Sequence, residues 1–485
     1  MNIVNDLIQL REKLTEIWGY DDFRHPQGEV IQSILQGKDS LTVMPTGGGK
    51  SLCFQLPALL QKGLTLVISP LVALMENQVQ ELWQKNLPAD ILHSEIPSAR
   101  RRVTINKIQN NHLRLLYLSP ETLLSAPLWQ LITRENVIIN GIIIDEAHCL
   151  IQWGNTFRPV YTRLGGVRWN LGKNPLPPLA CFTATADTFT RQQIIETLQL
   201  QQPQQFLVNP YKSNLQLEIK QIWTPKSRKN QVIQLLDKNK NKSGLIYLRT
   251  RKEAENLSDF LINLGYKNNA YHAGLPSIKR RQIEQDWLAE KTQFVVSTNA
   301  FGMGINKANL RWILHYQTPL LLSEYIQEIG RGGRDGKITQ AISLISEKTG
   351  FFDPTDKQRQ QYFLTQTLRQ YQQAEKFIKK LPPQENINNL LKITNNQDYQ
   401  IYLAILASSK QLQWQDPFNY KLTVNNATNA IKSMIEREQK LAQNMQEYLH
   451  TKKCRWYFLL NSFGFDTPIN FRCGKCDNCS RTKPN

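Results

Sequence analysis

The 485-residue sequence has no long hydrophobic run. No apolar stretch approaches the roughly 18 residues that a membrane-spanning helix needs, and the first residues, MNIVNDLIQLREKL, lack the basic lead and cleavage site of a signal peptide. We therefore expect a soluble cytoplasmic protein with no membrane partner. The sequence also has no low-complexity tail and no internal repeat, which excludes a solenoid architecture.

Acidic residues are scarce relative to basic ones. The chain has 40 Asp and Glu against 59 Lys and Arg, a net charge of +19. This balance favours a polyanionic partner, although an acidic protein or a membrane surface would suit it equally. The length is sufficient for about three domains.

Cysteines are few and unevenly placed. Three of the seven, Cys53, Cys149 and Cys181, lie singly in apolar segments and are expected to be inert core thiols. The other four follow the pattern C-x18-C-x2-C-x2-C near the end of the chain: Cys454, Cys473, Cys476 and Cys479. In a chain without a signal peptide this spacing predicts structural Zn²⁺ ligation rather than disulfides, and a redox-active dithiol is the alternative.

A glycine-rich segment, MPTGGGKS, occupies residues 44–51 between an expected strand and an expected helix. Its backbone N–H groups would bind a polyphosphate, Lys50 would reach the β- and γ-phosphates, and Ser51 would bind Mg²⁺. The predicted nucleotide-binding residues of this loop are Thr46, Gly47, Gly48, Gly49, Lys50 and Ser51. Met44 stands where the strict pattern has glycine, and a hairpin that binds no nucleotide is the alternative.

An acidic pair follows the apolar run at residues 142–144. Three isoleucines predict a buried parallel strand, which places Asp145 and Glu146 at its carboxyl end, where open α/β sheets bind ligands. Asp145 would then bind Mg²⁺ and Glu146 would orient the attacking water. Capping of the next helix is the alternative role for the two acids.

Short apolar runs alternate with amphipathic segments over residues 39–200, which predicts a parallel sheet covered by helices. After the connector QQPQQFLVNPYKSN the alternation restarts, without a second phosphate loop. In this second half, QEIGRGGRDG places Arg331 and Arg334 three residues apart, so that both guanidinium groups could reach a γ-phosphate bound by the first domain. A solvated arginine pair is the alternative.

Taken in order, these motifs and their neighbours resemble the RecQ family of DNA helicases in superfamily 2. The shared segments include YDDFRHPQ, SPLVALMENQV, LSPETLL, DEAH, QWGNTFRP, TATA, YHAG, STNAFGMGINK, QEIGRGGRDG, CRWYFLLNSFG and CGKCDNC. The resemblance implies an α/β fold of two tandem RecA-like phosphate-loop domains with parallel sheets, followed by a mostly helical zinc-binding subdomain that carries an insert. It predicts a short form of the family that ends after this subdomain.

The resemblance also implies roles for residues near the nucleotide. Tyr20 would stack on adenine, Gln27 would hydrogen-bond its edge, and Arg24 would support that site. His148 and Gln327 would connect the phosphate site to the domain interface.

Other roles concern the coupling of hydrolysis to DNA. Thr183 and Thr185 would relay movement. The aromatic-rich loop would couple DNA binding to hydrolysis through Trp153, Phe157 and Arg158, although these aromatics could instead fill the core.

This loop departs from the family pattern at three positions. Asn155, Thr156 and Val160 replace the usual His, Asp and Glu. We expect coupling to survive with altered strength.

The expected domains are residues 1–205, 206–348 and 349–485, with an insert at about 370–450 in the third. Within the insert, DYQIYLAILASSKQLQWQDPFNYKLTV predicts a helix followed by two short strands, with Trp414 and Tyr420 flanking a turn. This is the back half of a winged helix, which suggests a wing that contacts or splits duplex DNA. The alternative is a helical spacer whose aromatics pack on the zinc-binding subdomain.

The resemblance implies an ATP-dependent DNA helicase that moves 3′ to 5′ along single-stranded DNA, unwinds duplexes and acts in DNA repair or recombination. The predicted cofactors are ATP, Mg²⁺ and Zn²⁺, and the predicted partners are single-stranded DNA and forked or tailed DNA, with nucleoid association if the protein is bacterial. An RNA helicase is an alternative because superfamily 2 shares these engine motifs. A DNA-binding translocase or annealing protein without efficient unwinding is another.

Overall fold

The structure, a computed structural model, describes residues 7–152, 158–302, 305, 307–393, 398–423 and 427–480. The chain packs as two compact units. The first combines Met1–Val208 with Thr367–Glu436, and the second combines Asn209–Gln366 with Arg437–Asn485. None of the helices in the described ranges has the length and apolar character needed to span a bilayer.

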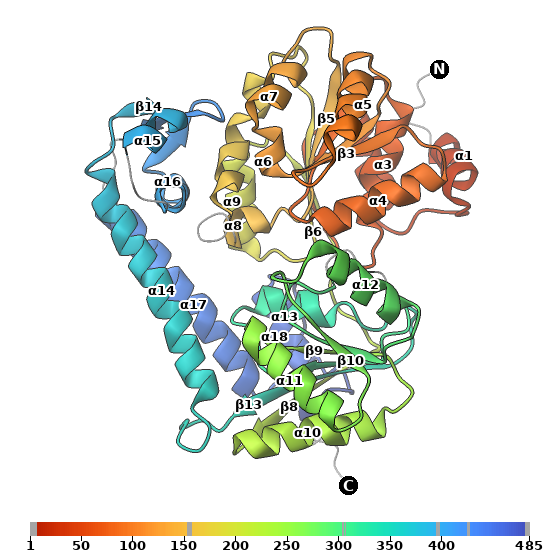
Figure 1. The fold of residues 1–485 in the computed structure, drawn as a ribbon, viewed down its shortest axis with the longest axis vertical. Helices are drawn as coiled ribbons and strands as arrows, with labels where there is room; N and C mark the ends of the chain where they lie inside the picture. Colours follow the sequence, from red (N-terminus) through yellow and green to blue (C-terminus); the bar gives the residue numbers. More distant parts are fainter. Residues whose placement is uncertain are drawn as a thin grey trace. The chain divides into compact units, whose positions relative to one another are not determined.

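The first unit is built on a seven-stranded parallel sheet with the order β3-β4-β2-β5-β6-β1-β7 (Figure 1). The strands are β1 (Ser40–Val43), β2 (Leu64–Ile68), β3 (Ala89–Leu92), β4 (Leu115–Leu118), β5 (Ile139–Ile144), β6 (Leu179–Thr183) and β7 (Gln204–Leu207). Strand β6 lies between β5 and β1. The loops that follow these three strands therefore emerge side by side at the carboxyl edge of the sheet.

Helices cover both faces of this sheet. Along β5, Ile142 and Ile144 enter one hydrophobic cluster and Ile143 enters the other, as the two-residue period of a strand requires. The helices of this part are α1 (Leu7–Trp18), α2 (Gln27–Leu35), α3 (Lys50–Leu60), α4 (Val72–Gln84), α5 (Ser98–Gln109), α6 (Pro120–Leu123), α7 (Ala126–Ile132), α8 (Cys149–Gln152) and α9 (Thr188–Thr197), with 3₁₀ segments η2 (Pro159–Gly166) and η3 (Arg168–Asn170).

The second unit contains a six-stranded parallel sheet with the order β10-β11-β9-β12-β13-β8. Its strands are β8 (Leu215–Ile222), β9 (Gly244–Tyr247), β10 (Asn268–Tyr271), β11 (Phe294–Ser297), β12 (Trp312–His315) and β13 (Thr339–Ser346). Its helices include α10 (Pro225–Lys238), α11 (Arg251–Asn263), α12 (Ser277–Leu288) and α13 (Leu322–Ile329). The predicted pair of parallel-sheet domains is confirmed.

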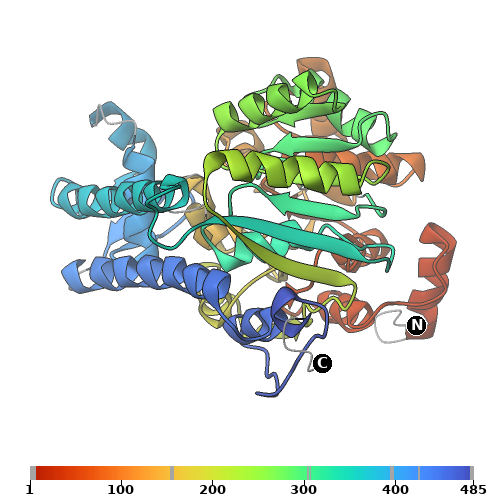
Figure 2. The same cartoon turned by 90° about the horizontal axis from the view of Figure 1, so that it is seen from below.

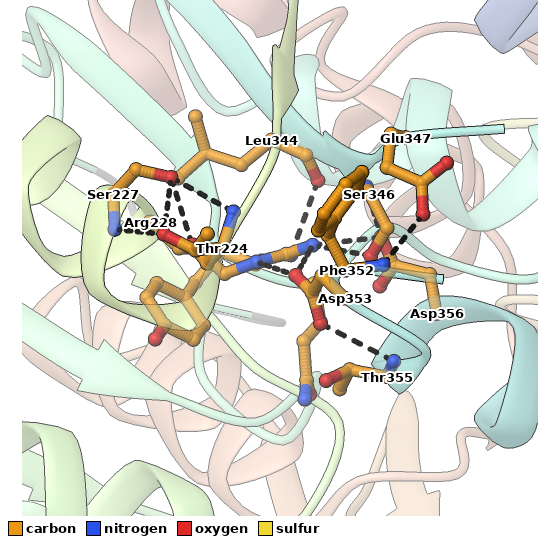
Figure 3. Close-up of polar contacts among 12 residues, drawn as sticks. Thr224, Ser227, Arg228, Leu344, Ser346, Glu347, Phe352, Asp353, Thr355 and Asp356 are labelled. Atoms are coloured by element: carbon orange, nitrogen blue, oxygen red, sulfur yellow. Dashed lines mark hydrogen bonds and ion pairs between the residues drawn. The ribbon is translucent and has the colours of Figure 1, made fainter. Parts of the chain in front are cut away.

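Two long helices, α14 (Thr355–Ile378) and α17 (Ala427–His450), lie side by side in both views (Figures 1 and 2). A buried arginine holds the start of α14 (Figure 3): Arg228 bonds Asp353 at 3.0 Å and Asp356 at 2.9 Å, and donates to the Ser346 hydroxyl at 2.9 Å. The N-cap Thr224 fixes the helix that carries Arg228, because its hydroxyl accepts from the Ser227 N–H. Arg228 therefore attaches the start of α14 to the end of β13 in the second sheet.

The insert connects α14 to α17 and has its own hydrophobic core. It comprises β14 (Gln384–Asn386), α15 (Ile387–Ile393), α16 (Tyr399–Ser408), β15 (Leu412–Trp414) and β16 (Asn419–Leu422). The three strands form an antiparallel sheet in the order β14-β16-β15, which with the preceding helices is the arrangement of a winged helix. Trp414 and Tyr420 lie in the insert's own core, so the expected packing of these aromatics on the zinc-binding subdomain is wrong.

Candidate nucleotide site and zinc centre

The phosphate loop connects β1 to α3 in the first unit. Gly49 has φ of 82°, a left-handed conformation that glycine adopts without strain, and α3 begins at the next residue. The loop N–H groups thus lie at the amino end of a helix, where anions are favoured. The Lys50 ammonium group donates to the Met44 carbonyl at 3.2 Å, so Met44 helps to hold this lysine within the loop.

The acidic pair follows β5, as the sequence predicts. Asp145 is 4% exposed, and its Oδ1 accepts from the Glu146 N–H at 3.0 Å. Burial and the neighbouring Glu146 raise the pKa of Asp145 to about 7, although Lys50 opposes them. Lys50 thus compensates the charge of this buried carboxylate only in part, which fits a site for a divalent metal ion.

Strand β6 provides the link between these two loops. His148 Nδ1 lies 3.0 Å from Thr183 Oγ1 and 3.3 Å from Glu146 Oε2. The Thr183 hydroxyl donates to the Thr185 carbonyl at 3.1 Å. The structure therefore brings Glu146, His148, Thr183 and Thr185 into one polar chain. The implied relay role of the two threonines stays a prediction.

The adenine-reading segment folds back onto the phosphate loop. Gln27 is 4% exposed, and its amide nitrogen donates to the carbonyls of Gly48 and Gly49, each at 3.2 Å. Its Oε1 accepts from the Arg24 N–H at 2.9 Å. Tyr20 is 57% exposed, as a ring that stacks on a base would be before the base arrives. The base-reading roles of these three residues stay predictions.

The two arginines of the second unit follow α13. Arg331 is 6% exposed and Arg334 donates to the Ile305 carbonyl at 3.2 Å. Burial, together with Arg331, lowers the pKa of Arg334 to about 10. Gln327 is half-buried on α13, one turn before Arg331. The burial of Arg331 differs from the alternative of a solvated arginine pair, which would be exposed.

A buried ion cluster beside them was missed by sequence reasoning. Arg249 bonds Glu328 with both nitrogens, at 2.9 and 2.8 Å, and His315 Nε2 lies 2.9 Å from Glu328 Oε2. Against the effect of burial, Arg249 and His315 lower the pKa of Glu328 to about 2. The position of Arg249 directly after the apolar run GLIYL was the available signal, because this run marks a strand and its carboxyl end.

The four carboxyl-terminal cysteines converge in the second unit. The sulfurs of Cys454, Cys473, Cys476 and Cys479 all lie within 4.8 Å of one another. Tetrahedral zinc with Zn–S bonds of about 2.3 Å needs sulfurs about 3.8 Å apart, and Cys473 and Cys479 are separated by 3.9 Å. The four thiols therefore fit one Zn²⁺.

Short helices and a buried ion pair support this cysteine cluster. Helices α18 (Arg455–Ser462) and α19 (Asp477–Ser480) each begin next to a cysteine. Arg455 bonds Asp477 at 2.8 and 2.9 Å, and Asp477 accepts from the Ile219 N–H of β8 at 3.1 Å. This outer shell attaches the cluster to the second sheet.

The aromatic-rich loop is described only at its end. Trp153 and Phe157 lie outside the described residues, so their roles stay predictions. Arg158 forms a two-pronged ion pair with Glu121, both distances being 3.0 Å, and donates to the Pro70 carbonyl. Arg158 thereby joins this loop to the SPLVALMENQV and LSPETLL segments.

Three parts of the chain match known families. Residues 24–194 match the DEAD/DEAH box helicase family, residues 227–336 the helicase conserved C-terminal domain, and residues 415–480 the RecQ zinc-binding domain. An ATP-dependent DNA helicase RecQ of Synechocystis sp. is 47% identical over 98% of this chain and 98% of its own length. The chain belongs to the RecQ family of ATP-dependent DNA helicases. A second RecQ relative, of Pasteurella multocida, is 41% identical over 71% of this chain and 52% of its own length.

Solved helicases share the fold of this RecQ-family chain. The helicase MrfA bound to DNA has a TM-score of 0.60 at 18% identity, covering 87% of this chain and 63% of its own. Dbp5 of S. cerevisiae, bound to RNA and ADP BeF3, has a TM-score of 0.58 at 18% identity, covering 70% of this chain and 88% of its own. At this identity the two structures show the fold alone.

Proposed function

We propose that this RecQ-family chain is an ATP- and Mg²⁺-dependent helicase that moves 3′ to 5′ along single-stranded DNA and unwinds forked or tailed duplexes. The observation that carries the proposal is the placement of the phosphate loop and the DEAH acids on either side of β6, where Thr183 contacts His148 of the DEAH segment and accepts at its carbonyl from the Met44 N–H at 2.9 Å. A role in DNA repair or recombination and a cytoplasmic, nucleoid-associated location remain predictions.

Within the first unit, each predicted residue has a definite task in hydrolysis. Lys50 and the N–H groups of residues 46–51 would bind the phosphates. Ser51 and Asp145 would hold Mg²⁺, which when bound neutralises charge on the phosphate oxygens. Glu146 would accept a proton from the attacking water, and the contact with His148 fixes its orientation.

The second unit contributes cations. Arg331 and Arg334 would stabilise the charge that develops on the γ-phosphate in the transition state, and Gln327 would connect them to the nucleotide. The cluster of Arg249, His315 and Glu328 joins the ends of β9 and β12 to α13, the helix that precedes the two arginines. Binding and hydrolysis would then alter the relation of the two RecA-like domains, which is the source of movement along DNA.

DNA would be gripped by the loops that Arg158 joins, with Trp153 and Phe157 stacking on bases. The net charge of +19 supports a polyanionic partner. Cys454, Cys473, Cys476 and Cys479 would hold one structural Zn²⁺.

The decisive experiment is steady-state ATP hydrolysis by the full chain with single-stranded DNA, matched RNA or neither, together with unwinding of duplexes that carry a 3′ or a 5′ tail. We expect stimulation by DNA and unwinding from the 3′ tail alone. Stimulation by RNA of equal size would favour the RNA helicase. Stimulation by DNA without unwinding would favour a translocase or annealing protein.

A further inference from the structure

The wing of the insert is docked on the RecA-like fold of its own unit. The wing tip, defined here as residues 415–418, meets the η2 segment. Arg163 of η2 donates from Nε to the Pro417 carbonyl at 2.6 Å, and Asn170 donates to the Gln415 carbonyl at 3.1 Å. These contacts join residues about 250 positions apart in the sequence.

Arg163 is the anchor of this contact. Its guanidinium group lies 5.5 Å from the ring centre of Phe418 and 5.9 Å from that of Trp414. Phe418 in turn packs edge-on against Trp129 of α7, with ring centres 5.7 Å apart. Among the described residues Arg163 forms no ion pair with an acid, so the wing supplies the groups that stabilise this half-buried cation.

The wing tip is preorganised for docking. The Asp416 carboxylate accepts from the N–H groups of Phe418 and Asn419 at 2.6 and 2.8 Å, which closes the turn and points the Pro417 carbonyl outward. A turn fixed in this way loses little conformational freedom when it binds.

The close packing of the insert on η2 also indicates that the wing is docked there. Helix α16, which is largely buried, packs against η2. A Cβ atom on Gly166 would lie 2.8 Å from the Asp416 carbonyl carbon, so the two backbones are in direct contact. The helix and wing that a winged helix would offer to a duplex are therefore covered by protein here.

The η2 segment, on which the wing tip docks, directly follows the loop that is proposed to sense DNA. Arg163 lies five residues after Arg158, within the same 3₁₀ segment that Arg158 caps. Arg158 bonds Glu121 and Pro70, which belong to the two loops expected to grip the strand. A short rigid path thus connects the wing tip to these loops.

We propose that the insert is an intramolecular docking module, in which the wing tip holds Arg163 and so positions Arg158 for the response of ATP hydrolysis to DNA. The inference rests on the proposed function, because it assumes hydrolysis that DNA stimulates. Arg163 is a positioning residue that acts through η2. The wing tip carries one acid and no base, which suits protein docking better than contact with phosphates.

Two variants are designed to weaken the contact between the wing tip and η2 by different means. Phe418→Ala removes the ring beneath Arg163, together with its edge-on contact with Trp129 of α7. Gly166→Ala inserts a methyl group against Asp416 at a position where φ is not in the left-handed region. Lys410→Ala is the matched control, because it removes an exposed ion pair with Glu196 of the same interface, an interaction that contributes little.

Docking is measured first without DNA or ATP, as hydrogen exchange of the amides of residues 159–166 in the full chain. We expect exchange at least tenfold faster in Phe418→Ala and Gly166→Ala and unchanged exchange in Lys410→Ala. ATP hydrolysis is measured next over a range of single-stranded DNA concentrations. We expect DNA-free turnover to remain at the wild-type value and the DNA concentration for half-maximal stimulation to rise at least threefold in both variants.

Three results would overturn the proposal. Unchanged exchange would show that the wing does not hold η2. Faster exchange with an unchanged DNA response would make the insert a passive spacer, and loss of forked-duplex unwinding alone would make the wing a strand separator. A wild-type chain without any DNA-stimulated turnover would instead refute the proposed function, while the exchange result would still report on docking.

Discussion

The two RecA-like domains both have a parallel sheet, but the pKa of a buried carboxyl group is raised in the first domain and lowered in the second. In the first, Asp145 is buried without a sufficient cation, and burial with Glu146 raises its pKa to about 7. In the second, Glu328 is equally buried, yet Arg249 and His315 lower its pKa to about 2. Both residues lie near the carboxyl edge of a parallel sheet, so the position alone does not tell them apart.

This difference in charge compensation distinguishes a candidate ligand-binding carboxylate, Asp145, from a structural one, Glu328. A carboxylate that is already neutralised by an arginine and a histidine has a structural task, because a further cation would gain little there. A carboxylate whose charge is only partly compensated is instead a candidate ligand for the metal ion proposed above. The four cysteines are a third cluster of the uncompensated kind, since several thiolates need a cation to lie so close together.

Removal of zinc should have the largest effect. We expect one Zn²⁺ per chain, and Cys476→Ser should lose it and destabilise the second unit by about 10 kcal/mol. Metal content and thermal unfolding test this. Cys53→Ala, which changes a buried cysteine outside the cluster, should keep the metal; a zinc-free wild type that melts at the same temperature would contradict the assignment.

The compensated cluster should respond strongly to the loss of one partner. Arg249→Ala leaves Glu328 buried without its cation, so we expect destabilisation by about 3 to 5 kcal/mol. The double variant Arg249→Met with Glu328→Gln removes both charges and should recover much of that loss. Equal destabilisation of the single and double variants in thermal unfolding would argue that packing, and not charge, explains the effect.

A substitution in the phosphate loop should change ATP hydrolysis without changing the stability of the fold. Lys50→Ala should lower kcat for ATP hydrolysis at least 100-fold, which corresponds to about 2.7 kcal/mol of transition-state stabilisation. The measurement is turnover at saturating DNA, with the melting temperature as control. Turnover within tenfold of the wild type would contradict the role given to this lysine.

Asp145 should produce the smallest effect, with a definite dependence on pH. Because its pKa is raised in the folded state, its contribution to stability is greatest below its ordinary pKa of 3.8 and is lost as pH rises through about 7. Asp145→Asn removes this loss. Its stability relative to the wild type should therefore increase by about 2.6 kcal/mol between pH 5 and pH 8.

Thermal unfolding without nucleotide or Mg²⁺ checks this expectation. A difference between Asp145→Asn and the wild type that does not change with pH would mean that the carboxyl group is already compensated. Addition of Mg²⁺ and nucleotide should reduce the difference, because the bound cation lowers the pKa of Asp145.

Much of the fold follows from local pattern. The alternation of apolar runs over residues 39–200 predicted the first parallel sheet, the three isoleucines predicted β5, and the turn between Trp414 and Tyr420 predicted the hairpin of β15 and β16. Strands β7 and β8 were missed. Strand β7 is largely exposed at a sheet edge, and β8 alternates buried and half-buried residues among polar ones, so neither forms an apolar run.

Some residues of the candidate site could likewise be found from the sequence, whereas other contacts could not. The sequence by itself identified Lys50, Asp145 and Glu146 as candidate nucleotide-site residues and the four cysteines as candidate zinc ligands, because phosphate and metal binding require particular residues at short, fixed spacings. Only the tertiary structure decided that Glu328 is compensated by Arg249 and His315, and that Arg163 receives a wing tip about 250 residues away. Those contacts depend on which surfaces folding brings together, and short-range spacing carries no information about them.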